Sequence, residues 1–243
     1  MPILEGKGVT RYFGGIAAVS NVDFTVEKGQ IFGLIGPNGA GKTTLFNLIS
    51  SALPTTSGII LFKERPITGL KPHQVCRLGI ARTFQIVKTF ANMPVFNNVV
   101  LGAHFGVQSS KNGRDPKKEA KEWIDFVELS AATTIPAKDL TLADQKRLEV
   151  ARALATQPDL LLLDEMMEGL NSTEVSKTMK LITRIRDKGI TIIMIEHVMK
   201  AIMNLCDHIL VMHHGEKLVE GAPQVIMSSE AVKKVYFGEK TNA

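Results

Sequence analysis

Residues 36–43 read Gly36-Pro37-Asn38-Gly39-Ala40-Gly41-Lys42-Thr43, which fits the pattern G-x-x-x-x-G-K-[ST]. An apolar run, Ile31–Ile35, precedes this stretch, and a helical pattern follows it from Thr44. Glycines allow successive backbone N–H groups to turn toward phosphate oxygens, and a helix N-terminus adds partial positive charge. The succession of strand, glycine-rich turn and helix therefore predicts a phosphate-binding loop rather than a turn with an accidental Lys-Thr pair.

The side chains of this loop are expected to have separate tasks. Lys42 should reach the β- and γ-phosphates of a nucleoside triphosphate, and the Thr43 hydroxyl should ligate Mg²⁺. We expect the nucleotide to be bound by Gly36, Pro37, Asn38, Gly39, Ala40, Gly41, Lys42, Thr43 and Thr44.

A second stretch completes the predicted site. Residues 160–163 are an apolar strand that ends in Asp164 and Glu165. Taken alone, such a strand end more often caps a following helix. Together with a phosphate loop, it indicates that Asp164 holds Mg²⁺ through water and that Glu165 polarises the attacking water. His197 follows the apolar run 190–195, at the edge where open parallel sheets bind ligands, and is either structural or hydrogen-bonded to the γ-phosphate.

Strand-like runs alternate with helical patterns, which indicates an α/β fold. The predicted strands cover residues 31–35, 58–62, 160–163, 190–195 and 209–212. Several are apolar throughout, as is typical of strands buried on both faces of a parallel sheet. A helix is predicted from Ser172, which we expect to be its N-cap, to a stop at Gly189.

The middle of the chain has a different character. From about Ile86 to Leu140 the strand signals fade, which predicts a mostly helical insertion. Within it, residues 109–116 are polar and rich in turn-forming residue types, so we expect a flexible loop there.

Composition limits the class of protein. The 243 residues, 44% of them hydrophobic, fit one large globular domain. No apolar run approaches the roughly 20 residues of a membrane-spanning helix, and the N-terminus lacks the pattern of a secretory signal. With two cysteines, Cys76 and Cys206, a reduced compartment is expected, so the sequence predicts a cytoplasmic location. The net charge of +5 is dispersed, which favours a solvated surface over a nucleic-acid site.

Taken together, the phosphate loop, the helical insertion, the Asp164-Glu165 strand end and His197 resemble the nucleotide-binding subunits of ABC transporters over essentially the whole chain. The resemblance implies an α/β P-loop NTPase fold, that of the ABC ATPases, with a mostly parallel core sheet, an N-terminal antiparallel β-subdomain and a helical insertion. It implies a single ABC ATPase domain, residues 1–243, with 1–85 and 141–243 as nucleotide-binding core and 86–140 as helical subdomain. The implied cofactors are ATP and Mg²⁺.

Finer features of the sequence match the same family. Phe13 matches the aromatic residue that stacks on adenine, with Tyr12 as the neighbouring alternative. Gln85 matches the glutamine that touches Mg²⁺ and the attacking water. The resemblance thus implies catalytic roles for Glu165, His197 and Gln85, and metal binding by Thr43, Gln85 and Asp164.

The signature of the family is altered in this chain. The usual Leu-Ser-Gly-Gly-Gln is replaced by Leu140-Thr141-Leu142-Ala143-Asp144. Thr141 keeps a hydroxyl and Ala143 an N–H for the partner subunit's γ-phosphate, so both are expected to bind nucleotide. Leu142 and Asp144 depart from the pattern, and a carboxylate repels a triphosphate unless it points away. The departure fits either drift within a subfamily or a weakened ATPase.

Particular phrases point to one branch of the family. Residues 81–85, Ala-Arg-Thr-Phe-Gln, and 195–197, Ile-Glu-His, resemble the ATPases of branched-chain amino acid importers. Similar phrases occur in ATPases for urea or amide uptake and for lipopolysaccharide export, which stay as alternatives. Two alternatives of another class are a soluble ABC ATPase that acts on DNA or ribosomes and a catalytically weak regulatory subunit.

The resemblance also implies partners. A second ATPase subunit, identical or different, faces the chain head to tail, so that each ATP lies between one phosphate loop and the other signature. Two transmembrane permease subunits hold this dimer at the inner face of the cell membrane, a solute-binding protein acts indirectly, and no nucleic acid is expected. The permease is expected beside Gln85 and residues 86–94, where Phe90 and Met93 either contact it or belong to the core.

Overall fold

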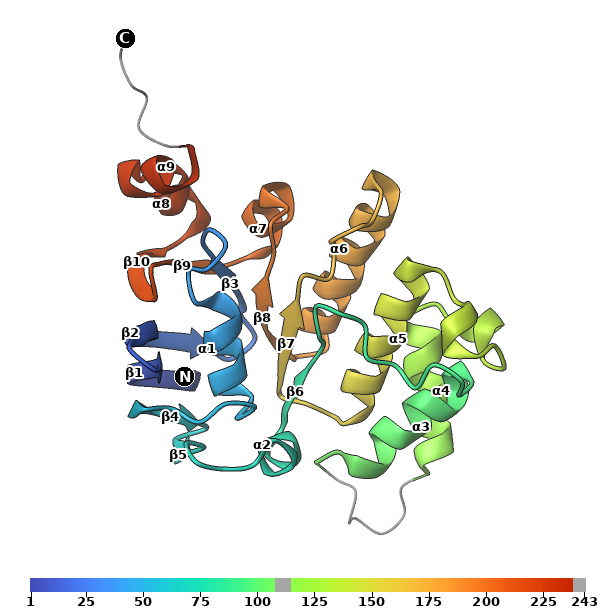
Figure 1. Ribbon diagram of the computed structural model, residues 1–243. Coiled ribbons are helices and arrows are strands. Elements are labelled where there is room, and N and C mark those ends of the chain that lie inside the picture. The colour runs from blue at the N-terminus through green and yellow to red at the C-terminus, as the bar shows by residue number, and fades with distance from the viewer. Residues whose placement is uncertain (108–114, 238–243) are drawn as a thin grey trace. The chain divides into compact units, whose positions relative to one another are not determined.

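The computed structural model describes residues 1–107 and 115–237, which fold into two compact units. The first unit comprises residues 1–72 and 191–243, and the second comprises residues 73–190. In Figure 1 the blue and red ends of the chain thus belong to the first unit. Residues 109–114 of the predicted loop lie outside the described residues. Among the helices that are described, none has the length and apolar character needed to cross a membrane.

The first unit contains an antiparallel sheet with the order β2-β1-β4-β5. Its strands are β1 (Pro2–Phe13), β2 (Ile16–Glu27), β4 (Ser57–Phe62) and β5 (Arg65–Pro66). β1 and β2 form a hairpin in which Phe13 pairs with Ile16, and Gly14 supplies the positive φ of 58° that a tight hairpin turn requires. Every second residue from 22 to 26 is buried, as expected for a strand with one covered face. The expected N-terminal antiparallel β-subdomain is confirmed.

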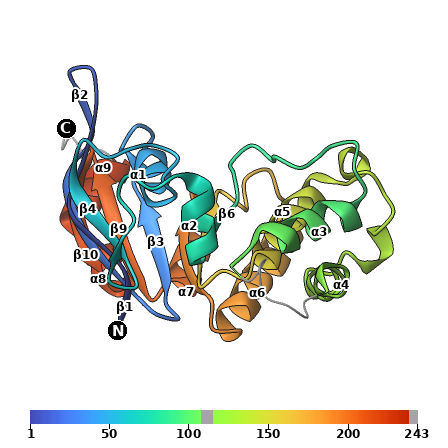
Figure 2. The same ribbon diagram turned by 90° about the horizontal axis from the view of Figure 1, so that it is seen from below.

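A mostly parallel group of strands forms the core of the first unit. It consists of β3 (Ile31–Ile35), β8 (Thr191–Ile195), β9 (His208–His213) and β10 (Glu216–Gly221). β3 pairs in parallel with both β8 and β9, and β10 runs antiparallel to β9. Figure 2 shows β10, β9 and β3 in this order. All residues of β3 and β8 are buried, which explains why their sequences are apolar throughout. The expectation of a mostly parallel core sheet is confirmed.

The helices of the first unit follow its strands. They are α1 (Lys42–Ile49), α7 (Met199–Leu205), α8 (Pro223–Ser228) and α9 (Glu230–Phe237). α1 buries Leu45, Phe46, Leu48 and Ile49, so this helix is fixed to the core by its apolar side chains. The loop between β3 and α1 is therefore held at both ends by buried elements.

The second unit combines a pair of parallel strands with helices. β6 (Ile80–Arg82) pairs with β7 (Leu160–Asp164), and the helices are α2 (Pro72–Leu78), α3 (Val95–Phe105), α4 (Pro116–Phe126), α5 (Leu142–Ala155) and α6 (Ser172–Asp187). Two 3₁₀ turns, η1 (Ser130–Ala132) and η2 (Ala137–Asp139), connect α4 to α5. Over the described part of 86–140, extended segments pair only at the isolated bridge between Pro94 and Pro136. The insertion is thus helical, while the subdomain boundaries at 86 and 140 stay a prediction.

The start of α6 differs from the prediction by one residue. Asn171, and not Ser172, is the N-cap: its Oδ1 accepts hydrogen bonds from the N–H groups of Thr173 and Glu174 at 3.0 Å each. The Glu174 carboxylate in turn accepts from the Asn171 N–H at 2.9 Å, which completes a capping box. Either side chain can cap a helix, but only Asn171 has this glutamate three residues later. The predicted stop is confirmed, since α6 ends at Asp187 just before Gly189.

Candidate functional site

The loop of residues 36–41 joins β3 to α1 and requires glycine at two of its positions. Gly36 has φ 151°, and a Cβ there would lie 2.2 Å from the backbone oxygen of Met212. Gly41 has φ 100°, and a Cβ there would lie 2.3 Å from the backbone oxygen of Ala18. Neither position can accept a side chain without displacing backbone, because real Cβ atoms do not approach so closely. The glycines of the sequence pattern therefore serve the close packing of this loop.

The N-terminus of α1 begins at a glycine. Gly41 is the N-cap, and since it has no side chain, it makes no side-chain hydrogen bond to the first N–H groups of the helix. The first turn also contains no acidic residue. Since the first N–H groups of a helix lack partners within it, this end of α1 is suited to an anion. Thr43 is exposed and Thr44 is half-buried in the same turn, so their N–H groups belong to this donor set.

Lys42 is held against the loop that precedes it. Its side chain is buried with 6% of the residue exposed, and Nζ donates to the backbone oxygens of Gly36 at 2.7 Å and Pro37 at 2.9 Å. Asn38 and Gly39 are exposed at the tip of the loop, while Ala40 is buried beneath it. A buried ammonium beside an exposed loop tip and an open helix end can bind a phosphate group.

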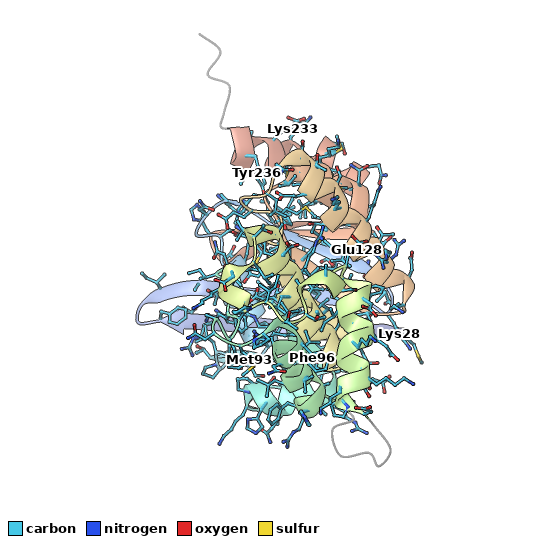
Figure 3. The ribbon with its side chains drawn as sticks, turned by 90° about the vertical axis from the view of Figure 1, so that its right-hand side faces the viewer. Lys28, Met93, Phe96, Glu128, Lys233 and Tyr236 are labelled. Atoms are coloured by element: carbon cyan, nitrogen blue, oxygen red, sulfur yellow. The ribbon has the colours of Figure 1, made fainter. Side chains whose placement is uncertain are left out.

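The loop has a partner that sequence reasoning missed. Tyr236 lies in α9, near Lys233 at the C-terminal end of the described chain (Figure 3). The backbone of Gly36 makes a hydrogen bond to the phenolic oxygen of Tyr236. Burial raises the pKa of Tyr236, and this hydrogen bond opposes the rise. No local pattern around residue 236 points to such a contact, because it depends on how α9 folds back in the first unit.

The aromatic residues predicted to contact adenine lie at the end of β1. Phe13 is 44% exposed and Tyr12 is 45% exposed, so exposure does not distinguish the two candidates. The guanidinium carbon of Arg11 lies 4.7 Å from the centroid of the Phe13 ring. This cation–π contact orients the Phe13 ring and favours Phe13 over Tyr12 as a fixed stacking surface.

In the second unit, the structure brings Gln85 and Glu165 together. The Gln85 side-chain amide donates to Oε2 of Glu165 at 2.8 Å. Glu165 is 7% exposed and has φ 49°, a left-handed backbone conformation that is uncommon for residues other than glycine. Strained backbone of this kind clusters at functional sites, where surrounding contacts stabilise it. The geometry therefore supports the predicted pairing of these two residues in one site.

Asp164 is the last residue of β7 and is paired with Arg82. Its Oδ2 lies 3.2 Å from a terminal guanidinium nitrogen of Arg82, and its N–H donates to the Thr83 hydroxyl at 3.1 Å. Burial lowers the pKa of Arg82, and the neighbouring Asp164 opposes this effect. Sequence reasoning gave no role to Arg82 or Thr83. No sequence pattern pointed to them, because their place depends on the parallel pairing of β6 with β7, which opposes Arg82 to Leu162.

The altered signature forms the start of α5. Thr141 is the N-cap: its hydroxyl accepts from the Asp144 N–H at 3.2 Å and donates to Asp144 Oδ2 at 2.9 Å. Oδ1 of Asp144 lies 3.6 Å from a guanidinium nitrogen of Arg147. The Asp144 carboxylate thus contacts two residues of its own helix end, Thr141 and Arg147. Its negative charge stabilises the positive N-terminal end of the α5 dipole. Ala143 lies in the first turn, and Leu142 is exposed beside it.

The predicted site residues fall into two sets. The first unit contains Phe13, the loop with Lys42, Thr43 and Thr44, and His197, which is exposed just beyond β8. The second unit contains Gln85, Asp164, Glu165, Thr141 and Ala143. Within the second set the structure joins Gln85 to Glu165 directly, whereas Thr141 bonds within its own helix.

The oxygen-bearing residues fit a magnesium ion better than a transition metal. In the parts of the chain that are described, His, Cys, Asp and Glu form no group of three that could hold a metal ion. The second unit offers the hard oxygen donors of the Gln85 amide and the Asp164 carboxylate, and the first unit offers the Thr43 hydroxyl. Mg²⁺ prefers such donors and usually completes its shell with water and substrate phosphate.

Comparison with known proteins gives concordant matches along the chain. Residues 19–168 match the family described as ABC transporter. The chain is 37% identical to the high-affinity branched-chain amino acid transport ATP-binding protein BraF of Pseudomonas aeruginosa and to LivG of Escherichia coli K12, with 98% of each chain covered. It is similar to the ADP conformation of MJ1267, an ATP-binding cassette of an ABC transporter, with a TM-score of 0.89, 30% identity, 98% of this chain and 100% of that one covered.

Proposed function

The chain belongs to the ABC transporter family, and from this premise we propose that it is the ATP-hydrolysing subunit of an importer for branched-chain amino acids. The proposal of this solute rests on BraF and LivG, which carry that substrate in their names and match the chain over 98% of its length. The observation that carries the catalytic part is the hydrogen bond between Gln85 and Glu165, two residues predicted to act on the same water.

The first unit supplies the binding chemistry of this proposal. Lys42 and the uncapped N-terminus of α1 neutralise the phosphates of ATP, while the exposed ring of Phe13 stacks on adenine. On arrival of the triphosphate, the Lys42 ammonium exchanges carbonyl oxygens for phosphate oxygens, which are the stronger acceptors because they are charged.

The second unit supplies the hydrolytic chemistry. The Glu165 carboxylate accepts a proton from the attacking water, and the Gln85 amide orients that carboxylate through the 2.8 Å hydrogen bond. Thr43, Gln85 and Asp164 would hold Mg²⁺, which would supply positive charge at the phosphate oxygens. His197 hydrogen-bonds the γ-phosphate, and Thr141 with the Ala143 N–H serves the nucleotide of the second subunit.

Partners follow from the same proposal. The chain works as a dimer with a second ATPase subunit, bound to two permease subunits at the inner face of the membrane and served by a solute-binding protein. The segment after Gln85 is suited to contact the permease, since Ile86 is 78% and Phe90 is 50% exposed. Met93 is half-buried at the approach to α3, near Phe96 (Figure 3), and so belongs more to the core than Phe90 does.

Uptake measurements test the proposed solute. Cells that lack this chain should lose ATP-dependent uptake of labelled leucine, isoleucine and valine, and the wild-type chain should restore it while Glu165→Gln should not. Uptake of a solute with its own transporter serves as control. Unchanged uptake of all three amino acids, with loss of urea or amide uptake or of lipopolysaccharide export, would assign the chain to another branch. Recovery of the chain with ribosomes or DNA, and without membrane proteins, would end the transport proposal.

A further inference from the structure

Helix α5 carries three charged residues on one face. Lys146, Glu149 and Arg152 are spaced by three residues, which aligns them along the helix. Lys146 and Glu149 are each only 5% exposed, an unusual degree of burial for lysine and glutamate. Charged groups this deeply buried are costly unless they are hydrogen-bonded, so their partners indicate what the helix face holds.

The backbone of Lys88 is bound at both of its polar groups, the N–H by Glu149 and the carbonyl oxygen by Arg152. Oε1 of Glu149 accepts from the Lys88 N–H at 2.5 Å, and Nη1 of Arg152 donates to the Lys88 carbonyl oxygen at 2.5 Å. The Arg152 guanidinium also lies 4.9 Å from the centroid of the Phe90 ring. The segment that follows Gln85 is thus fastened to α5 at Lys88 and at Phe90.

Lys146 fastens a second segment to the same face. Its Nζ donates to the backbone oxygens of Glu165 at 2.8 Å and Glu168 at 2.7 Å. The segment that carries Gln85 and the segment that carries Glu165 are therefore both tied to α5. The 2.8 Å hydrogen bond between Gln85 and Glu165 joins the two segments to each other directly.

We propose that Glu149 is a positioning residue of the hydrolytic site, which fixes the segment 84–90 to α5 and thereby sets Gln85 against Glu165. The inference rests on the proposed catalytic roles of Gln85 and Glu165 and adds a residue that contacts neither nucleotide nor water. α5 begins at the altered signature, so the same helix that faces the second subunit also holds the segment that faces the permease.

Steady-state kinetics of the chain purified with its membrane partners tests this role. Glu149→Ala should lower kcat by about 10-fold or more while the Kd for ATP stays within about twofold of wild type, because only the orientation of the hydrolytic pair is lost. Glu149→Gln keeps an acceptor for the Lys88 N–H and should recover most of kcat. Glu122→Ala, at an exposed glutamate of α4, is the matched control and should change neither quantity.

A second variant covers the case in which Glu149→Ala fails to fold. Arg152→Met removes the bond to the Lys88 carbonyl but keeps bulk beside Phe90, and it should also lower kcat without weakening ATP binding. If both variants fold and keep kcat within about twofold of wild type while Glu165→Gln is inactive, Glu149 has no positioning role. If Glu165→Gln itself turns over normally, the proposed hydrolytic site fails and this inference fails with it. Equal losses in Glu149→Ala and Glu149→Gln would also overturn it, since the conservative change should rescue.

Discussion

The side-chain amide of Gln85 donates a hydrogen bond of 2.8 Å to Oε2 of Glu165, a residue 80 positions further along the chain. Gln85 follows β6 and Glu165 follows β7, and the parallel pairing of these strands brings their carboxyl ends to one edge. Glu165 is held there in a left-handed backbone conformation with its carbonyl oxygen bound by Lys146. A carboxylate oriented in this way is prepared to act as a general base.

Glu165→Gln should reduce ATP turnover by about 100-fold or more, because a positioned general base contributes about 10²–10⁴-fold. Binding of ATP should persist, since the phosphate loop is untouched, and the dimer should accumulate because its nucleotide is not hydrolysed. Phosphate release and size-exclusion chromatography with ATP measure both effects. Glu122→Gln, at an exposed position, is the control. Wild-type turnover in Glu165→Gln would remove Glu165 from the role of base.

Lys42→Ala should weaken ATP binding by about 10- to 100-fold, because hydrogen bonds to charged groups contribute about 1.5–3 kcal/mol each. The variant removes the Nζ that now bonds the backbone oxygens of Gly36 and Pro37, so the loop itself also loses support. Calorimetric titration with ATP gives the affinity. Lys28→Ala, an exposed lysine outside the loop (Figure 3), should bind as the wild type does. Equal affinities of Lys42→Ala and Lys28→Ala would contradict the loop assignment.

Asp144→Gln should leave turnover unchanged or raise it, because in the proposed dimer the substitution removes a negative charge near the nucleotide of the second subunit. The folded chain should lose about 0.3–1 kcal/mol of unfolding free energy, since a carboxylate in the first turn of α5 stabilises the helix dipole. Chemical denaturation and phosphate release measure the two quantities on the same preparation. A large fall in turnover would show that Asp144 contributes to ATP hydrolysis.

Cys206 should resist alkylation in the folded chain. Burial, followed by the charges of Asp207 and Glu196, raises the pKa of Cys206 to about 12, so at pH 8 about one thiol in 10⁴ is the reactive thiolate. Its reaction with iodoacetamide should be at least about 100-fold slower in the folded than in the denatured chain. Because the folded-state pKa is raised, the stability from the neutral thiol is complete below pH 9 and falls as the pH rises toward 12. Cys206→Ser identifies the label, and equal rates in both states would contradict the burial.

Local patterns in the sequence were sufficient where the chemistry is local. The strand 31–35, the loop after it and α1 were predicted because glycine spacing and apolar runs depend on neighbours along the chain. The start of α6 is the exception. Ser172 and Asn171 are both good N-caps, and the partner Glu174 decides between them. The spacing of Asn171 and Glu174 is itself a local pattern, so the capping-box rule applied to the sequence would have identified Asn171.

Contacts between distant segments were outside the reach of such patterns. Arg82 pairs with Asp164 because β6 lies beside β7, and Tyr236 reaches Gly36 because α9 folds back toward the loop. Glu149 reads in the sequence as one charged residue of a polar helix, yet it is buried and holds the backbone at Lys88. Nothing in its immediate neighbours reveals this.

The sequence alone was enough to determine the α/β class, the phosphate loop and the family, since those depend on residue order and spacing. The tertiary structure decided which residues stand beside Glu165, how Asp144 is turned back along α5, and which charges α5 buries. The physical reason is that hydrogen bonds and burial act through space, and strand pairing and helix packing set the distances across which they act.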